Sequence, residues 1–381
     1  MGKRRRVKKR FSIVSLLVLS LSFGSIFYYD VMVDRARSTI SFGKLNSSVV
    51  ESIPCTPNMD YERSVVFESD AQGIIKSDGT SFVYYGLDGQ AIWEKEINSP
   101  APLVRFGQGF VVVGDYGTGE IYALNLKGEI IQSIPGLGKL QDIKIGDNDV
   151  LVVLLEQDNQ VVLLNKSLEE ITRISLPKGD VIDFDLSANK SLLAFSFIKM
   201  DKSNFYSNVM LYSLDGRLIG ATNFEQQFIF DLKVVEDKVI GVLDSGIFVL
   251  NGENELLQSL EIDRRIEAFH VDESGIIYLN LTKNPEDLTD TRPNNVITAI
   301  DESGQKVIED IVVEVSIDQL TSDSAYLTFL SADKVYQLDK KTGELLKIQT
   351  LEKDALKVHT VDKTVFGIEY IDKFDIYSLT Y

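Results

Sequence analysis

The chain of 381 residues is poor in the residue types that most often carry chemistry: it has one cysteine, two histidines and one tryptophan. A single thiol, Cys55, cannot form an internal disulfide, so the fold must be held by packing. We interpret Cys55 as an incidental residue. His270 and His359 lie far apart in the chain, and no Gly-rich phosphate loop or Gly-x-Ser-x-Gly elbow occurs. The sequence therefore offers neither a zinc cluster nor a histidine-based triad, and we expect no enzymatic activity.

Three further polar features have structural interpretations. His270 lies in the segment Ala268–Val271, where we expect a hydrogen-bonded strand histidine rather than a metal ligand. The acidic segments Asp147–Asp149 and Asp272–Gly275 lack the spacing of an EF-hand. We interpret both as acidic β-turns.

Positive charge is scarce outside the first ten residues. The chain has 39 basic and 57 acidic residues, and seven of the basic ones lie in MGKRRRVKKR at the amino terminus. The remainder carries 32 basic against 57 acidic residues, a net charge of −25. Such a surface repels nucleic acid and anionic headgroups, so we expect no nucleic-acid partner.

One long apolar run is present, residues 11–29, without a charged side chain. Its 19 residues match the thickness of a bilayer core, and the basic residues before it predict a cytoplasmic amino terminus. We therefore predict a basic cytoplasmic tail (1–10), a transmembrane helix in contact with the lipid bilayer (11–29) and an extracytoplasmic tether (30–60). The protein would be a single-pass cell-membrane protein. A cleaved signal peptide is the alternative, although no Ala-x-Ala-like site follows.

Helical periodicity is scarce in residues 61–381, and a repeated hairpin takes its place. Each copy has an alternating strand, a turn with Asp or Asn, often followed by Gly, and a return strand. The strand positions that precede the turns are spaced by 36 to 50 residues. The copies begin at Tyr84, Ile121, Val161, Leu211, Ile247, Val296, Tyr336 and Ile376.

This spacing leaves room for four short strands in each repeat, as in a propeller blade. We predict an all-β fold, an eight-bladed β-propeller over residues 61–381. The last unit offers strands near 357–360, 364–370 and 374–379 but ends before its outer strand. We expect an amino-terminal strand to fill that place, either Val49–Ile53 or Ser64–Glu68, because a bare edge invites aggregation. The second choice would reduce the ring to seven blades.

Two repeats are longer than the others. The extra residues, Lys199–Asn208 and Thr282–Asn295, fall between the second and third strands of their blades, and we expect long loops on one face of the ring. Long loops in a compact domain are often functional. We name Phe205, Tyr206, Arg292 and Pro293 as candidate partner-binding residues; simple variation in loop length is the alternative.

The hairpins YALNLKGEII and YQLDKKTGELLKI resemble the repeats of quinoprotein-like (PQQ-type) propellers, and the likeness covers residues from about 63 onward. The tail and span also resemble an uncharacterised family of bacterial membrane-anchored propellers. Only Trp93 occupies the tryptophan position of the repeat. Elsewhere aliphatic residues lie near it, and we expect them to form the contacts between blades: Ile131, Ile219, Leu257 and Leu346.

The resemblance implies a quinone cofactor with bound Ca²⁺ only for the catalytic members, which are known for a vicinal cysteine pair that this chain lacks. We expect no cofactor and no metal. The function that we expect is a non-catalytic scaffold that binds an envelope or secretion protein. The alternatives are a sensor of small ligands or glycans in the central channel and, with least support, a quinone-dependent dehydrogenase.

Overall fold

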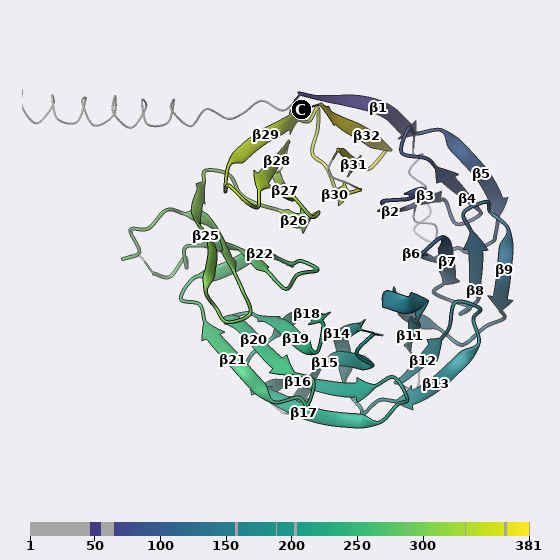
Figure 1. Cartoon of the computed structure of the whole chain (residues 1–381), viewed down its shortest axis with the longest axis horizontal. Coiled ribbons are helices and arrows are strands. Elements are labelled where there is room, and N and C mark those ends of the chain that lie inside the picture. Colours follow the sequence, from purple (N-terminus) through teal and green to yellow (C-terminus); the bar gives the residue numbers. More distant parts are fainter. Residues whose placement is uncertain are drawn as a thin grey trace, which may run out of the picture. The chain divides into compact units, whose positions relative to one another are not determined.

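Eight four-stranded antiparallel sheets surround a common axis (Figure 1). The computed structural model describes residues 46–54, 65–156, 159–187, 189–201, 204–287, 289–331, 333–361 and 364–380. The predicted tail and span (1–29) and Cys55 lie outside these ranges. Within them, no helix is long and apolar enough to cross a membrane.

Each sheet is one blade, and its strands follow one another from the axis outwards. Blade 1 contains β2 (Val66–Asp70), β3 (Gly73–Ser77), β4 (Ser81–Tyr85) and β5 (Ala91–Glu96). Blade 2 contains β6 (Pro102–Gly107), β7 (Phe110–Asp115), β8 (Ile121–Asn125) and β9 (Ile130–Ile134). Blade 3 contains β10 (Leu140–Ile145), β11 (Leu151–Leu155), β12 (Gln160–Leu164) and β13 (Glu170–Ser175). Blade 4 contains β14 (Asp180–Ser187), β15 (Leu192–Asp201), β16 (Asn204–Ser213) and β17 (Leu218–Glu225).

The second half of the ring repeats this order. Blade 5 contains β18 (Ile229–Val235), β19 (Lys238–Leu243), β20 (Gly246–Asn251) and β21 (Leu256–Glu261). Blade 6 contains β22 (Arg265–Val271), β23 (Ile277–Thr282), β24 (Asn295–Ile300) and β25 (Lys306–Val313). Blade 7 contains β26 (Gln319–Ser322), β27 (Tyr326–Ser331), β28 (Lys334–Asp339) and β29 (Leu345–Thr350). Blade 8 contains β30 (Lys357–Thr360), β31 (Val365–Glu369), β32 (Lys373–Thr380) and β1 (Asn46–Pro54).

Strand β1 closes the ring by pairing antiparallel with β32, from Asn46 opposite Thr380 to Pro54 opposite Lys373. The prediction that Val49–Ile53 fills the seam is therefore confirmed. The other choice, Ser64–Glu68, is wrong, because β2 pairs with β3 as the inner strand of blade 1. The ring consequently has eight blades, not seven. Strand β1 also lies within the range that we assigned to the tether.

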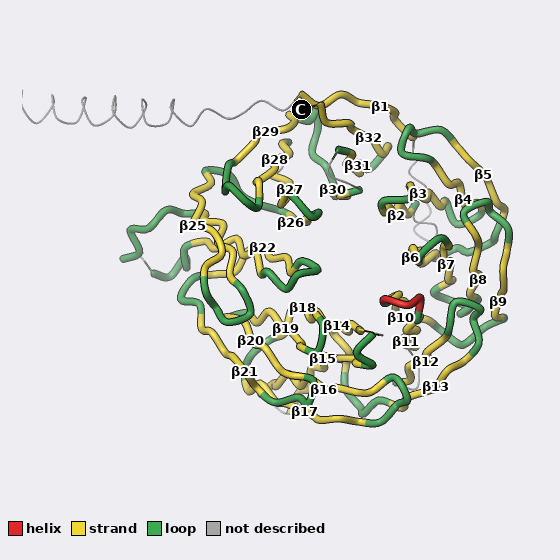
Figure 2. Tube along the Cα trace, in the orientation of Figure 1, coloured by secondary structure: helices red, strands yellow, loops and turns green. Residues whose placement is uncertain are grey.

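The predicted hairpin turns form as the side-chain chemistry requires. The Asn125 side-chain oxygen accepts hydrogen bonds from the backbone N–H groups of Lys127 (2.9 Å) and Glu129 (3.0 Å). Gly128 between them has φ +78°, a conformation that glycine adopts without a Cβ clash. Asp301 makes the equivalent pair of bonds at the same turn of blade 6. Figure 2 shows how short such turns are between the strands.

The core lies between neighbouring blades. All five side chains of β11 are buried, because each blade packs on a neighbour through both of its faces. Between blades 3 and 4, for example, Val152 and Leu163 pack with Phe184 and Phe195. This arrangement gives the central strands continuous apolar runs, and it allows a chain of this length to fold as one ring rather than as two globular domains.

The contacts between outer strands correct one prediction. A Cβ at Gly128 of blade 2 would lie 2.8 Å from Trp93 of blade 1, so the tryptophan does pack on the next blade. At the equivalent glycines Gly216 and Gly304 of later blades, a Cβ would lie closest to the aliphatic side chains of Ile174 (3.4 Å) and Leu260 (3.5 Å), so the contacts are aliphatic but come from other residues than predicted. Ile131 and Leu257, expected at these contacts, are instead 52% and 53% exposed. They stand one residue earlier in the strand than the position that corresponds to Trp93, and one step along a strand turns a side chain to the other face.

Candidate partner-binding face

The ring has two faces, which differ in their connections. We call one the crossing face: it carries the connection from the second to the third strand of each blade and the crossing from one blade to the next. The other, the turn face, carries the two tight turns of each blade. Because the strands run up and down, both long insertions lie on the crossing face, as predicted.

The insertion in blade 4 is a strand extension rather than the predicted loop. Strands β15 and β16 continue their pairing as far as Asp201 opposite Asn204. Phe205 is opposite Met200, and Tyr206 is opposite both Lys199 and Glu225 of the outer strand. Aromatic and apolar residues continue through this insertion, and they favour strand over coil. The prediction of a loop over Lys199–Asn208 is therefore wrong.

The insertion in blade 6 is a loop, residues 283–294, which extends outward beside β25 (Figure 1). Arg292 donates to both carboxylate oxygens of Asp263 (3.2 and 2.9 Å) and binds Asp290 as well. The hydrogen bond from Arg292 lowers the pKa of Asp290 to about 2. Arg264, which is buried, donates to the carbonyl oxygens of Pro293 (2.7 Å) and Asn294.

These contacts fix the loop to the crossing between blades 5 and 6. The Arg292 guanidinium is already bound to two carboxylates, whereas the Pro293 ring is exposed. The four residues named from the sequence remain divided between two blades, Phe205 and Tyr206 on blade 4 and Arg292 and Pro293 on blade 6. Blade 5 stands between them.

The crossing face also carries exposed apolar side chains that are better candidates for partner contact than the four residues named from the sequence. Among the described residues, the three most exposed large hydrophobic side chains are Met200 (79%), Ile371 (68%) and Leu356 (62%). Met200 lies near the tip of the β15–β16 hairpin, Ile371 in the turn before β32 and Leu356 in the crossing before β30. Sequence reasoning missed Ile371 and Leu356, because the exposure of one apolar residue in a short turn has no signal in the sequence.

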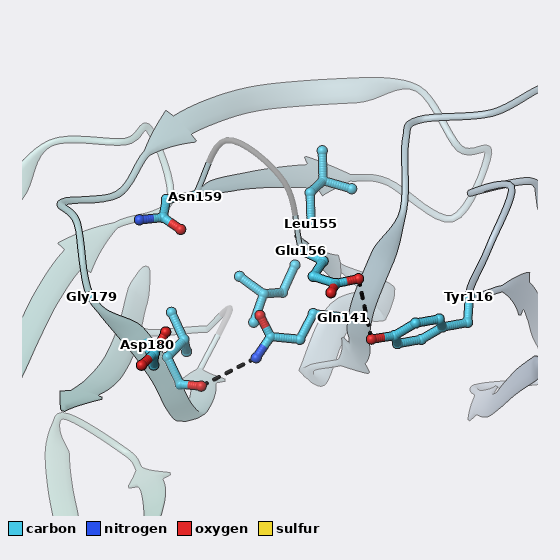
Figure 3. Close-up of a pocket in the computed structure, with 9 residues that line it drawn as sticks. Tyr116, Gln141, Leu155, Glu156, Asn159, Gly179 and Asp180 are labelled. Atoms are coloured by element: carbon cyan, nitrogen blue, oxygen red, sulfur yellow. Dashed lines mark hydrogen bonds between the residues drawn. The ribbon is translucent and has the colours of Figure 1, made fainter.

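A small pocket lies on the same face, where blades 2, 3 and 4 meet. Its volume is about 260 Å³, and Figure 3 shows Tyr116, Gln141, Glu156, Asn159 and Asp180 around it. Tyr116 donates to the Glu156 carboxylate at 3.3 Å, as the dashed line shows. No sequence pattern indicates this pocket, because its side chains come from three repeats.

On the inner strands, charged side chains join one blade to the next. Arg105 of β6 binds Asp142 of β10 at 2.7 Å, and Lys144 of β10 binds Asp183 of β14 at 2.7 Å. The Asp183 carboxylate also accepts a hydrogen bond from the backbone N–H of Leu232 in β18 (2.7 Å). These contacts tie four consecutive blades together near the axis.

Asp231 is the most perturbed carboxyl group of this inner network. Burial, together with the neighbouring carboxylate of Asp183, raises its pKa to about 7. Phe230, the preceding residue, is 42% exposed and stacks with Phe269 of β22 at 6.1 Å. The inner surface of blades 4 to 6 therefore combines acidic and aromatic groups.

A second polar cluster lies on the turn face, between blades 6 and 7. Lys340 donates to Asp272 (2.7 Å) and to the Ser322 hydroxyl (3.0 Å). His270 Nε2 is 3.0 Å from the same hydroxyl, and burial lowers the pKa of His270 to about 4. Asp272, Ser322 and Lys340 border a cavity of about 590 Å³ together with Tyr278. His270 is thus a strand histidine with a hydrogen-bond partner, and Asp272 caps a turn through Ser274 and Ile276, as expected.

The architecture and the closure by β1 define an eight-bladed β-propeller. The chain belongs to DUF5711, a family of unknown function, whose sequence profile matches residues 47–371. A search of curated proteins found no significant match.

Solved structures of other propellers are similar in fold. BamB from Moraxella catarrhalis has a TM-score of 0.56 and 11% identity, and the match covers 87% of this chain and 99% of BamB. Saccharomyces cerevisiae Sqt1 has a TM-score of 0.59 and 13% identity over 89% of this chain and 99% of Sqt1. A streptogramin B lyase has a TM-score of 0.51 and 10% identity over 74% of this chain and 95% of the lyase. Identities this low indicate a shared fold and do not transfer an activity.

Proposed function

We propose that this protein is a membrane-anchored, extracytoplasmic β-propeller that binds a protein partner of the cell envelope and performs no catalysis. One observation carries the proposal: Met200, Ile371 and Leu356, the most exposed large hydrophobic side chains of the described residues, all lie on the crossing face. Isolated exposed apolar residues are ordinary on a surface. Met200 lies on blade 4, whereas Leu356 and Ile371 lie on blade 8, so the crossing face offers apolar contacts on two opposite sides of the ring, as a partner that spans this face would need.

The path of β1 leaves the crossing face free of the start of the described chain. Strand β1 runs from the turn face, at Asn46, to the crossing face, at Pro54. The described chain therefore begins at the turn face, opposite the face that carries both insertions.

Capture of the partner tests the proposal. Full-length protein is crosslinked in intact cells, purified and analysed by mass spectrometry, as wild type and as the triple variant Met200→Ser, Leu356→Ser and Ile371→Ser. The control, Ile92→Ser, Ile131→Ser and Leu257→Ser, removes side chains of 52–56% exposure from the outer strands. We expect a defined envelope protein to be lost only from the first variant. Equal capture by both variants would contradict the assignment of the face.

The predicted topology has its own test. Cys55 is the only thiol of the chain, so a membrane-impermeant maleimide applied to intact cells reports on one position. We expect labelling without permeabilisation. A second variant, Glu253→Cys in a Cys55→Ser background, places the thiol in an exposed turn of blade 5. Labelling of this variant only after permeabilisation would place the ring inside the cell and refute the proposal.

A sensor of small ligands or glycans is the second candidate, favoured by the exposed Phe230 beside the acidic groups of the inner strands. Aromatic and carboxylate groups together suit a polar ligand with apolar faces. A thermal-shift screen with oligosaccharides and metabolites tests it, because a ligand that binds the folded state raises the unfolding temperature. Under the scaffold proposal we expect no shift that is lost on the substitution Phe230→Ser.

The quinone cofactor of the catalytic propellers does not fit the residues present. Such a cofactor needs a Ca²⁺ site beside it. The Asp183 carboxylate of the inner network is already bound to Lys144 and to a backbone N–H. In the described part of the chain, no three His, Cys, Asp or Glu side chains converge on a possible metal position. The resemblance therefore extends, in our proposal, to the repeat and not to the chemistry.

A further inference from the structure

The cavity of about 590 Å³ between blades 6 and 7, on the turn face, is bordered by a carboxylate with a buried and unused oxygen. This carboxylate belongs to Asp323, in the turn between β26 and β27. Its Oδ1 atom accepts hydrogen bonds from the backbone N–H groups of Ala325 (2.6 Å) and Tyr326 (2.9 Å). Its Oδ2 atom is buried and has no hydrogen-bond partner among the described residues. A ligand that donates a hydrogen bond would remove this unfavourable state.

Lys340, in the turn between β28 and β29, places a donor at the same border. Its backbone N–H donates to the carbonyl oxygen of Ala325 (3.0 Å), which ties its turn to the turn of Asp323. Its ammonium group donates to Asp272 (2.7 Å) and to the Ser322 hydroxyl (3.0 Å). These bonds use two of the three N–H groups of the ammonium. Within the described ranges no hydrogen bond uses the third, so it remains available to a ligand.

The rest of the border is mainly apolar. Tyr278 lies beneath the Lys340 ammonium group, which is 5.2 Å from the centre of its ring. Ile276 and Val307 add aliphatic side chains, and Val307 is 48% exposed. Ser324 contributes an exposed hydroxyl. The volume falls within the range of ordinary small-molecule sites, which combine apolar walls with a few polar groups.

These groups restrict the charge of the ligand. An anion would meet Asp323, whereas the ammonium group of Lys340 is already paired with Asp272. An organic cation would lie beside Lys340, a like charge. An apolar ligand would leave the Asp323 Oδ2 atom without a donor. A neutral ligand with several hydroxyl groups avoids all three problems, because each hydroxyl both donates and accepts.

We infer that this cavity binds one neutral sugar ring, whose hydroxyl groups donate to Asp323 Oδ2 and accept from the Lys340 ammonium group. The C–H groups of the ring would lie against Val307, the exposed aliphatic side chain of the border. The inference goes beyond the scaffold function, since the cavity lies on the face opposite the proposed partner surface. It makes Asp323 a specificity-determining residue, because its Oδ2 atom is the acceptor that only a donor can satisfy.

Saturation-transfer NMR of the full-length protein, in a detergent without a sugar headgroup, tests the inference. The probes are the methyl glycosides of glucose, galactose, mannose and N-acetylglucosamine, with the uronate and the 2-amino analogue of each hexose. We expect at least one neutral glycoside to bind and its charged analogues to bind about tenfold more weakly. Binding of no neutral glycoside, or equal binding of a charged analogue, overturns the inference.

Two pairs of variants locate the binding. Asp323→Asn keeps Oδ1 for the turn and replaces the Oδ2 acceptor with a donor, so the affinity should fall about tenfold. Asp301→Asn makes the same change in a turn of blade 6 outside the cavity and should leave the affinity unchanged. Val307→Arg should block the cavity, whereas Val312→Arg, at a 52% exposed position of the same strand, should not. The exposed pair keeps the test decisive if Asp323→Asn does not fold. An equal effect of a variant and its control refutes the assignment.

Two further comparisons separate the cavity from the other proposed sites. Sugar binding that survives Asp323→Asn but is lost in Phe230→Ser belongs to the central channel and overturns the inference. Partner capture should be undiminished in Asp323→Asn, because the scaffold surface is on the other face. Loss of both sugar and partner from this variant would contradict a separate site, whereas loss of the sugar alone supports it.

Discussion

Closure of the ring by β1 predicts that Ile53 is a critical residue for stability. Ile53 is 2% exposed and packs with Phe67 and Ile74 of blade 1 and with Phe374 and Ile376 of blade 8. It therefore belongs to the core that joins the last blade to the first. Replacing a buried isoleucine with alanine costs about 2–5 kcal/mol, because apolar contact is lost and a cavity remains. We expect Ile53→Ala to lower the free energy of unfolding by about 3 kcal/mol.

Val50 provides the control in the same strand, since its side chain is 40% exposed. Val50→Ala should change the free energy of unfolding by less than about 1 kcal/mol. Urea unfolding followed by far-ultraviolet circular dichroism measures both variants. If the two midpoints fall by the same amount, the seam does not depend on the packing of Ile53, and burial of this side chain is not what holds the ring closed.

Three further predictions concern blades 1 to 6. Burial and the Asp183 carboxylate raise the pKa of Asp231 in the folded state, where Lys144 and Asp185 are also close. The native protein therefore binds this proton more tightly than the unfolded chain does. Because of this difference, the free energy of unfolding falls as the pH rises from about 4 to 7. Asp231→Asn should therefore raise the free energy of unfolding at pH 8 by up to about 4 kcal/mol, and by much less at pH 4. An equal gain at both pH values in urea unfolding would exclude this titration. Gly128→Ala should destabilise the protein more than Gly109→Ala, because both glycines have positive φ but only the first lies against a side chain, Trp93, and equal urea midpoints would show that this contact adds nothing. Arg292→Ala should release the loop 283–294 and speed its cleavage by a protease, whereas Arg217→Ala in a tight turn of blade 4 should not; unchanged cleavage would mean that the ion pairs do not hold the loop.

The sequence was sufficient for the repeat because each hairpin is a local structure. The turn at Asn125 depends only on its side chain and on a glycine three residues later, and both are visible in the sequence. Predicting the number of blades required one non-local argument: the unpaired edge of the last blade must be covered by a strand from the amino-terminal part of the chain. That reasoning identified Val49–Ile53, although it left Ser64–Glu68 open.

The errors came from properties with weak local signals. The first such property is the register of a strand after a β-bulge. In the pairing of β4 with β5, the register shift between Tyr84 and Tyr85 determines which residue of the outer strand faces the next blade. An alignment on aliphatic residues therefore selected Ile131 and Leu257, which lie one position too early. The blade 4 insertion is another, because an aromatic-rich extension and a long loop can occupy the same number of residues.

The polar pocket between blades 2, 3 and 4 could not be predicted from the sequence, because its character depends on which hydrogen bonds are already made. Gln141 and Asn159 can each donate or accept, and their bonds to the Val181 and Pro177 carbonyl oxygens fix which atom of each amide faces the protein. Those bonds exist because the crossing between blades 3 and 4 brings Pro177 and Val181 beside two earlier segments of the chain. The polarity of the pocket is thus a consequence of blade packing.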